Sequence, residues 1–175
     1  MPDIPSAIPA AIPRAALVTG GAKRLGRAMA LALAGAGFDI ALHHGHSRAE
    51  AEATAAEIHA LGRRATILSA DLSREAETTR LLPAATGALG PIGVLVNNAS
   101  TFERDEWHDA TRESWDHHLE PNLRAPFVLA QAFAKALPEM AEGVVVNMLV
   151  AIVMNRANGG TVNAQNILFT IPGTP

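Results

Sequence analysis

Short apolar segments alternate with helix-length segments along most of the chain, and this order limits the possible folds more than any other feature. Five apolar runs are predicted as strands and four longer segments as helices: strands at 15–19, 39–43, 65–69, 92–96 and 143–150, helices at 26–36, 49–61, 74–89 and 111–137. This βαβ order predicts right-handed crossovers and a parallel sheet. Because the strands are nearly continuous apolar runs, both sheet faces should be covered. The predicted fold class is α/β, with a doubly wound parallel sheet of about five to six strands.

The two ends of the chain depart from this pattern. A proline at every third or fourth position prevents a helix over residues 1–13, where we expect a flexible Pro-rich arm. Residues 14–150 form the predicted domain, and residues 151–175 are expected to be an atypical tail with one more short strand within 166–175. A doubly wound sheet needs helices on both faces, and no helix-length segment follows residue 150. The C-terminal part of the sheet is therefore expected to be incomplete.

Composition excludes several classes of protein. Apolar residues make up 49% and charged residues 18%, which is typical of a globular domain. The net charge of −3 argues against a nucleic-acid partner, and the absence of Cys excludes disulfides, thiolate metal sites and Cys nucleophiles. The N-terminus lacks the pattern of a secretory signal, and the most apolar stretch, 28–38, is about half the length of a membrane span. We therefore expect a cytoplasmic protein without a membrane partner.

A glycine-rich segment follows the first predicted strand. The sequence TGGAKRLGR at 19–27 leads directly into the first predicted helix. Glycines there let the backbone approach a pyrophosphate, and a helix N-terminus supplies free N–H groups and a positive dipole end. The spacing differs from G-x-G-x-x-G, so an ordinary glycine-rich turn is the alternative. Lys23 and Arg24 favour a phosphate ligand, because an exposed turn requires neither. The sheet would then be of the Rossmann type.

The end of the second predicted strand indicates which dinucleotide is bound. Folds that bind NAD place an acidic residue there, about 20 residues after the glycines, to bind the ribose 2′-hydroxyl. Here the sequence is LHHGHSR at 42–48, without an acid, and Asp39 lies at the other end of the strand. A cluster of His, Ser and Arg suits a 2′-phosphate, so NADP(H) is favoured over NAD(H). Two alternatives remain: the histidines ligate a metal, although no carboxylate or Cys accompanies them, or they are solvent-exposed turn residues.

From about residue 15 to residue 149 the chain resembles the short-chain dehydrogenase/reductase family. The loop at 19–26 is similar to the family's T-G-x-x-x-G-x-G, with Arg24 in place of the middle glycine. Three further motifs match in order: Asp71-Leu72, the acidic position that holds the adenine; Asn97-Asn98-Ala99, the N-N-A-G motif, with Ser100 replacing glycine; and Asn122, which supports the proton relay. The resemblance implies that NADP(H) is held by Gly20, Arg24, Leu25, Gly26, His46, Ser47, Asp71, Leu72, Asn97 and Ala99.

Three details resemble pteridine reductases and the related dihydromonapterin and dihydrofolate reductases. They are the G-A-K-R-L-G loop, L-H-x-x-x-S after the second strand, and N-N-A-S-x-F after the fourth. The resemblance implies that Arg24 contacts a phosphate or the pterin, that Ser47 holds the 2′-phosphate and that Phe102, next to Ser100, stacks on the substrate. The substrate would be a small pterin-like or carbonyl compound. The alternative for Phe102 is a core aromatic.

The catalytic pair of the family is missing from this sequence. In the family, a Tyr supplies or takes the proton and a Lys four residues later lowers the Tyr pKa, after the fifth strand. This chain has no Tyr, and no Lys follows Lys135. Val150 stands where the family has Ser, and the TVNA at 161–164 resembles the sixth strand of the family. We therefore expect that a segment of tens of residues has been lost. His117 and His118 could act as acids, but a solvated helix face is the favoured interpretation.

Three hypotheses follow for the function. The chain is an NADPH-dependent reductase of pterin-like or carbonyl substrates, or a catalytically inactive protein that binds NADPH or docks with a partner, or an unstable fragment with exposed apolar strand surface. The segment 111–137 resembles the helix through which family members form dimers, so a homo-oligomer through this helix is also expected.

Overall fold

The computed structural model describes residues 8–103, 108–148 and 167–171, the last of these as backbone only. Its elements follow the predicted order, with boundaries that differ by a few residues at most places. They are β1 (Ala15–Val18), α1 (Arg24–Gly35), β2 (Asp39–His44), α2 (Arg48–Ala60), β3 (Ala65–Ser69), α3 (Glu75–Leu89), β4 (Val94–Asn97), α4 (Arg112–Leu119), a π-helical turn (Glu120–Arg124), α5 (Ala125–Ala136), β5 (Gly143–Asn147) and β6 (Ile167–Ile171).

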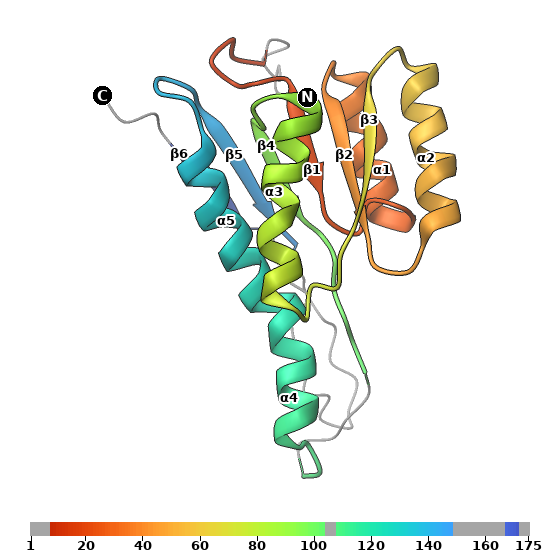
Figure 1. Cartoon of the computed structure of the whole chain (residues 1–175), viewed down its shortest axis with the longest axis vertical. Coiled ribbons are helices and arrows are strands. Elements are labelled where there is room, and N and C mark those ends of the chain that lie inside the picture. The colour runs from red at the N-terminus through yellow and green to blue at the C-terminus, as the bar shows by residue number, and fades with distance from the viewer. Residues whose placement is uncertain (1–7, 104–107, 149–166, 172–175) are drawn as a thin grey trace, which may run out of the picture.

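The strands form one sheet in the order β3-β2-β1-β4-β5-β6 (Figure 1). The first five strands are parallel, which confirms the α/β, Rossmann-type fold class. The extra strand expected within 166–175 is present as β6, but it runs antiparallel to β5, with Gly143 opposite Ile171. An antiparallel neighbour needs no crossover helix, which agrees with the lack of a helix-length segment after residue 150. The stretch 161–164, which resembles a sixth strand, lies outside the described residues.

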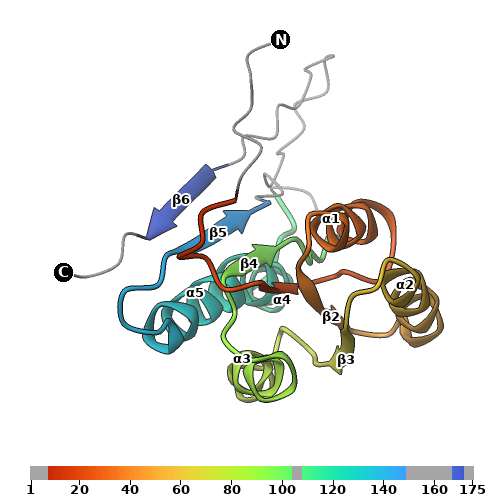
Figure 2. The same cartoon turned by 90° about the horizontal axis from the view of Figure 1, so that it is seen from above.

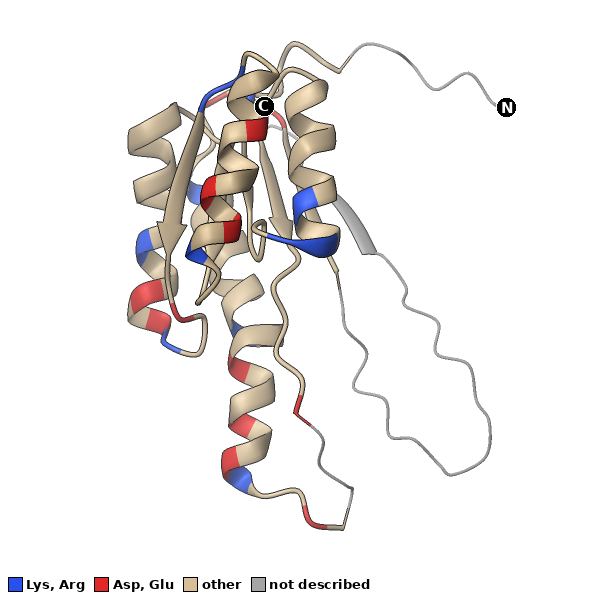
Figure 3. Cartoon of the chain, turned by 90° about the vertical axis from the view of Figure 1, so that its right-hand side faces the viewer, with Lys and Arg blue, Asp and Glu red and all other residues tan. Residues whose placement is uncertain are grey.

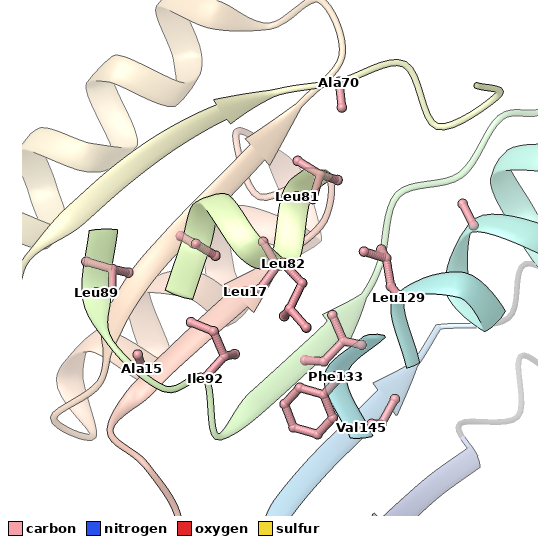
Figure 4. Close-up of a cluster of buried hydrophobic side chains, with 14 of the residues drawn as sticks. Ala15, Leu17, Ala70, Leu81, Leu82, Leu89, Ile92, Leu129, Phe133 and Val145 are labelled. Carbon is pink, nitrogen blue, oxygen red and sulfur yellow. The ribbon is translucent and has the colours of Figure 1, made fainter. Parts of the chain in front are cut away.

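Helices cover both faces of the sheet (Figure 2). On the face of α3 and α5, alternate strand residues such as Leu17, Leu95 and Val145 form a first core with Phe133 (Figure 4). On the face of α1 and α2, the intervening residues form a second core: Ala16, Val18, Ile40, Leu42, Val94 and Val96, joined by Ala30, Ala34, Phe38, Ala55 and Ile58. Because side chains alternate between the faces of a strand, a continuous apolar run supplies both cores.

Within the arm expected over residues 1–13, Ile12 and its neighbours contact the folded domain. The Ile12 side chain is buried in the second core. Glu142 donates its backbone N–H to Ala11 O at 3.0 Å, and Arg14 Nη2 donates to Ile8 O at 2.9 Å. Proline spacing excludes a helix but does not prevent an irregular segment from making such contacts. Residues 1–7 lie outside the described part.

The long helical segment expected at 111–137 is divided into three parts. A capping box between Thr111 and Ser114 starts α4, and the π-helical turn that follows contains Pro121. Proline has no backbone N–H and disturbs the preceding turn, which explains why the regular helix is interrupted there. Pro126 lies in the first turn of α5, where proline is tolerated. Nowhere in the described residues is a helix long and apolar enough to cross a membrane.

The amino end of β2 carries an ionic cluster. Asp39 accepts hydrogen bonds from Arg64 N at 3.0 Å and Arg64 Nε at 2.8 Å, and pairs with Arg63 Nη2 at 2.7 Å. Burial by itself would raise the pKa of Asp39, but the bonds from Arg64 and the two positive charges outweigh it and hold this pKa below its usual value. Arg64 also donates to Leu89 O at the end of α3. Asp39 thus stabilises the edge of the sheet opposite the site described next.

Candidate functional site

A cleft of about 1040 Å³ opens at the carboxyl ends of the parallel strands. It lies where the strand order reverses, between β1 and β4, which is the position at which doubly wound sheets bind ligands. The loops after β1, β2, β3 and β4 all contribute to its walls. The cleft brings together eleven residues that the sequence analysis singled out: Gly20, Arg24, Leu25, Gly26, His46, Ser47, Asp71, Leu72, Ala99, Ser100 and Phe102.

The loop between β1 and α1 depends on two glycines. Gly20 has a φ of +62°, a backbone conformation that favours glycine. A Cβ at Gly26 would lie only 2.0 Å from Gly20 O and 2.6 Å from Asn98 Nδ2, so no larger residue fits there. The glycines therefore fold the loop tightly on itself and against the loop after β4, rather than simply making it flexible.

Arg24 begins α1 in a strained backbone conformation. Its φ of 52° lies in the left-handed region, at the position where the T-G-x-x-x-G-x-G pattern has a glycine. Such strain is unfavourable for a residue with a side chain and is concentrated at functional sites. Among the described residues, no side chain caps α1 at Lys23 and no acid occupies its first turn, so the backbone N–H groups of this turn and the Arg24 side chain are available to an anion. Figure 3 shows Lys and Arg at this end of α1.

Thr19 and Asn98 join the glycine loop to the loop after β4. The Thr19 hydroxyl donates to Val96 O at 3.2 Å and accepts from the backbone N–H groups of Asn98 and Ala99 at 2.9 and 3.0 Å. Asn98 Nδ2 donates to Thr19 O at 3.0 Å and to Gly20 O at 3.2 Å. Sequence reasoning assigned no role to either side chain, although both stand inside the motifs that it used.

Asn97, which the sequence analysis expected to hold NADP(H), is not among the residues that line the cleft. Its side chain is 3% exposed and donates from Nδ2 to Asn147 Oδ1 at 2.8 Å, across the pair formed by β4 and β5. The reason is strand alternation: Asn97 is the last residue of β4 and stays within the sheet, whereas Asn98 is the first to reach the cleft.

The histidines after β2 have separate environments. His43 is buried, accepts a hydrogen bond from Gly20 N at Nδ1 (3.2 Å) and contacts Ala70 O through Nε2 (3.1 Å). Since a carbonyl only accepts, the imidazole is neutral with its proton on Nε2. Burial lowers the pKa of His43 to about 4, against the opposing effect of the Ala70 bond and with a smaller contribution from His44. His43 thus joins the loops after β1 and β3.

His46 and Ser47 lie at the rim of the cleft. His46 is exposed and Ser47 is half-buried. Ser47 stands at the N-cap of α2, yet in the described structure its hydroxyl makes no capping bond, which leaves it available to a ligand. Over the described ranges, no group of three or more His, Cys, Asp or Glu side chains is arranged to hold a metal ion.

Asp71 and Leu72 form the side of the cleft that follows β3. Asp71 Oδ1 accepts from the Ser73 hydroxyl at 2.7 Å and from Ser73 N at 2.9 Å, and these two bonds hold the pKa of Asp71 below its usual value. Burial opposes this shift, and the positive charge of Arg74 adds to it. The carboxylate is therefore ionised and held in a fixed orientation at the mouth of the cleft.

Phe102 lies on the opposite side of the cleft, in the loop after β4. Its side chain is 67% exposed, so the alternative of a core aromatic is wrong. Asn122 holds the preceding residue: Oδ1 accepts from Thr101 N at 2.8 Å and Nδ2 donates to Thr101 O at 2.7 Å. Asn122 therefore fixes the loop beside the cleft.

The solvated helix face expected for His117 and His118 is found only at His117. That side chain is partly exposed, lines the cleft and pairs with Glu103 Oε1 at 3.2 Å. His118 is 7% exposed and bonded on both ring nitrogens. The expectation failed because a loop distant in sequence covers this part of α4, and the polarity of α4 gives no sign of that contact.

Comparison with known proteins identifies the family. The sequence model described as "short chain dehydrogenase" matches residues 14–162, most of the chain. The chain belongs to the short-chain dehydrogenase family. The NADP complex of FolM alternative dihydrofolate reductase 1 from Brucella canis is 40% identical, with a TM-score of 0.71 over 75% of this chain and 53% of that one. The NADPH complex of a blue fluorescent protein from a metagenomic library is 36% identical, with a TM-score of 0.69 over 72% and 52% of the two chains.

Curated relatives support the same conclusion. The short-chain dehydrogenase/reductase FrzI of Cladobotryum sp is 34% identical over 124 residues, or 71% of this chain and 48% of the relative. The 2-dehydro-3-deoxy-D-gluconate 5-dehydrogenase of Escherichia coli (strain K12) is 38% identical over 122 residues, or 70% and 47%. The chain thus spans about half the length of the curated relatives that it matches.

Proposed function

We propose that this short-chain dehydrogenase binds NADP(H) in the cleft at the carboxyl ends of its parallel strands. The observation that carries the proposal is the start of α1. Among the described residues, the strained Arg24 has no ion-pair partner there and stands beside an uncapped helix N-terminus with no acid in its first turn. That arrangement suits a pyrophosphate. When bound, the dinucleotide supplies the hydride of the reaction. Gly20, Arg24, Leu25 and Gly26 would hold its diphosphate, and Asp71, Leu72 and Ala99 would flank its adenine and ribose.

The choice of NADP(H) over NAD(H) depends on the end of β2. Ser47 and His46 are available there, and Asp39, the only acid of β2, is committed to Arg63 and Arg64 at the other end of the strand. Because the residues at the carboxyl end of β2 include no acid, a 2′-phosphate can bind the Ser47 hydroxyl there and lie near His46. The NADP and NADPH in the complexes of two similar proteins support this assignment.

We propose a planar pterin-like compound or a carbonyl compound as the substrate class. The exposed ring of Phe102 at the edge of the cleft offers a surface on which a planar ring can stack, next to Ser100. The similarity to an alternative dihydrofolate reductase supports the pterin-like class. The reaction of the whole protein would be hydride transfer between the nicotinamide and this substrate.

A second candidate is a protein that binds NADPH or docks with a partner but does not turn over. It is favoured by the sequence, which contains no Tyr and has no Lys after Lys135. Lys135 lies in the last turn of α5, away from the residues that line the cleft. For docking, the exposed side chains of Trp115, Leu123 and Phe127 on the α4–α5 segment offer an apolar contact to a second copy of the chain.

A fluorescence titration of the purified chain with NADPH, and with NADH as the control, tests the proposal. We expect saturable binding in the micromolar range that is at least about tenfold tighter for NADPH, because one charge-assisted contact accounts for such a ratio. An assay for NADPH oxidation with a pterin or a carbonyl compound then separates the reductase from the binding protein. Absence of NADPH binding by a folded, monodisperse sample would refute the reductase and the NADPH-binding protein, and would leave docking with a partner as the remaining candidate.

A further inference from the structure

His118 is a buried polar side chain that the proposed function leaves unexplained. It lies in the last turn of α4 and is 7% exposed, whereas the side chain of the adjacent His117 is 44% exposed. Its Nδ1 is 2.7 Å from Ser114 O in its own helix, and its Nε2 is 2.9 Å from Glu103 N and 3.0 Å from Glu103 O. A helix residue therefore holds the backbone of a loop residue fifteen positions earlier.

The contacts of His118 determine where its proton lies. A carbonyl oxygen only accepts hydrogen bonds, so Nδ1 must carry a proton to contact Ser114 O. In the neutral ring, Nε2 is then an acceptor for Glu103 N–H; in the charged ring, Nε2 donates to Glu103 O instead. His118 therefore holds Glu103 in either protonation state, through the backbone rather than through the Glu103 carboxylate.

Two side chains of the same helical segment thus hold the two neighbours of Phe102. Asn122 binds both backbone polar groups of Thr101, and His118 lies within hydrogen-bond distance of both backbone polar groups of Glu103. Phe102 stands between them, and its ring meets the His118 ring edge-on, with centroids 6.1 Å apart and an interplanar angle of 64°. Without these contacts, the ring of Phe102 could adopt several orientations, because its side chain is 67% exposed.

We propose that His118 is a positioning residue which, together with Asn122, holds Phe102 as a fixed platform for a planar substrate. This inference rests on the proposed function, since the platform serves the substrate that lies against the bound dinucleotide. The role is one of orientation, because His118 touches the loop and not the cleft. Its loss should weaken the binding of a planar ligand and leave dinucleotide binding unchanged.

The first test needs no ligand. In the full chain, hydrogen exchange followed by NMR should show the Glu103 amide about fivefold less protected in His118→Phe, which keeps a ring but has no nitrogen. His118→Gln, whose amide oxygen can accept from Glu103 N–H, should restore most of the protection. His117→Gln removes the contact with the Glu103 carboxylate and the edge contact with the His118 ring but neither bond to the Glu103 backbone, so it is the matched control, with protection unchanged. Equal protection in wild type and His118→Phe would overturn the proposal.

A measurement on the wild-type chain guards against a variant that fails to fold. The ¹⁵N shifts of the His118 ring should show a proton on Nδ1, in either the neutral or the charged ring. A neutral ring with its proton on Nε2 and a bare Nδ1 would contradict the contact with Ser114 O and overturn the proposal.

The last test uses pterin as the probe, titrated into the protein saturated with NADP. His118→Phe should raise the Kd for pterin about three- to tenfold, the effect of a displaced aromatic contact, and change the Kd for NADPH by less than about twofold. An equal loss for both ligands would show that His118 has only a structural role. If wild type binds NADPH but not pterin, the platform role is overturned while the cofactor proposal stands. If it does not bind NADPH, the proposed function fails, and hydrogen exchange still decides the contact with Glu103.

Discussion

The two sides of the sheet differ in how completely they are built. Around β1, β2 and β3, helices α1, α2 and α3 cover both faces, and every residue of β1 and β2 is buried. In β5, Val145 faces α5 and is 3% exposed, whereas Val144 and Val146 on the other face are only half-buried. Among the described residues, that face of β5 belongs to the second core, which the N-terminal residues Ile8 and Ile12 join.

This difference separates the region proposed to bind the dinucleotide, here called the dinucleotide side, from the region around β5, here called the β5 side. The dinucleotide side has its helices, its glycine loop and a buried histidine that joins two of its loops. On the β5 side, the face toward α5 belongs to a buried core, whereas the other face is covered in part by the irregular segment that contains Ile8 and Ile12. The cleft can be well built around β1, β2 and β3 while one face of β5 is only half-buried among the described residues, because each βα unit brings its own loop to the cleft.

The largest effect should come from the covered face of the β5 side. Phe133 is 1% exposed in the first core, so Phe133→Ala should lower the free energy of unfolding by about 3–5 kcal/mol. Urea denaturation gives the value. Phe127→Ala, on the same helix but 53% exposed, is the matched control and should cost less than about 1 kcal/mol. Similar losses for the two variants would mean that α5 does not form a core with β5.

The second-largest effect should come from His43, which joins two loops of the dinucleotide side and should make the stability depend on pH. His43 has a pKa of about 4 in the folded protein, below its unfolded value of about 6.5. Between these values the unfolded chain binds a proton that the folded protein does not, so stability should fall as the pH drops from about 6.5 to 4, by about 2–3 kcal/mol in all. His43→Gln should remove this part of the pH dependence in urea titrations at several pH values. The same slope in both proteins would contradict a buried, neutral His43.

A third prediction asks whether the dinucleotide side recognises the 2′-phosphate by itself. Replacing Arg24 and Ser47 together by Ala should weaken both dinucleotides through the lost diphosphate contact of Arg24, and NADPH about tenfold more than NADH, because only NADPH carries the 2′-phosphate assigned to Ser47. Fluorescence titration measures both. Arg27→Ala is the matched control: it removes an α1 arginine that pairs with Glu57 outside the cleft. Equal losses for NADPH and NADH would show that the phosphate assignment is wrong.

The smallest effects are expected for substitutions on the two faces of β5, which can be compared directly. Val145→Ala should cost about 2 kcal/mol, from two buried carbon groups and the cavity they leave, and Val146→Ala about 1 kcal/mol, because its side chain is half-exposed already. Both substitutions remove the same atoms from adjacent positions, so differences in strand propensity largely cancel. If Val146→Ala costs as much as Val145→Ala, the second face is as well covered as the first, and the comparison fails.

Much of the candidate site could be predicted from the sequence, because it depends on local backbone rules. A glycine loop between a strand and a helix must lie at the carboxyl edge of the sheet, and so must the residues after the next strands. Eleven of the predicted residues line one cleft for this reason. Asn97 was assigned wrongly because β4 ends one residue later than predicted, and a shift of one residue reverses the side-chain direction.

The role of His118 was not predicted, although a signal was present. Ser114, His118 and Asn122 recur at intervals of four, so they share one side of the helical segment. The sequence could show that these polar residues lie together, but not that the loop around Phe102 covers them. The packing of Ile12 escaped prediction for the same reason, because both contacts join segments that are far apart in the chain.

The sequence by itself determined the order of strands and helices, the parallel sheet and the edge at which the cleft opens. These follow from hydrophobic periodicity, glycine positions and the handedness of βαβ units, which act over short stretches of chain. Only the tertiary structure decided which side chains are buried and how the last strand pairs. His43 and His118 are buried, Phe102 is exposed, and β6 pairs antiparallel with β5. The burial of a side chain depends on which distant segments pack over it, and a local sequence pattern carries no information about those segments.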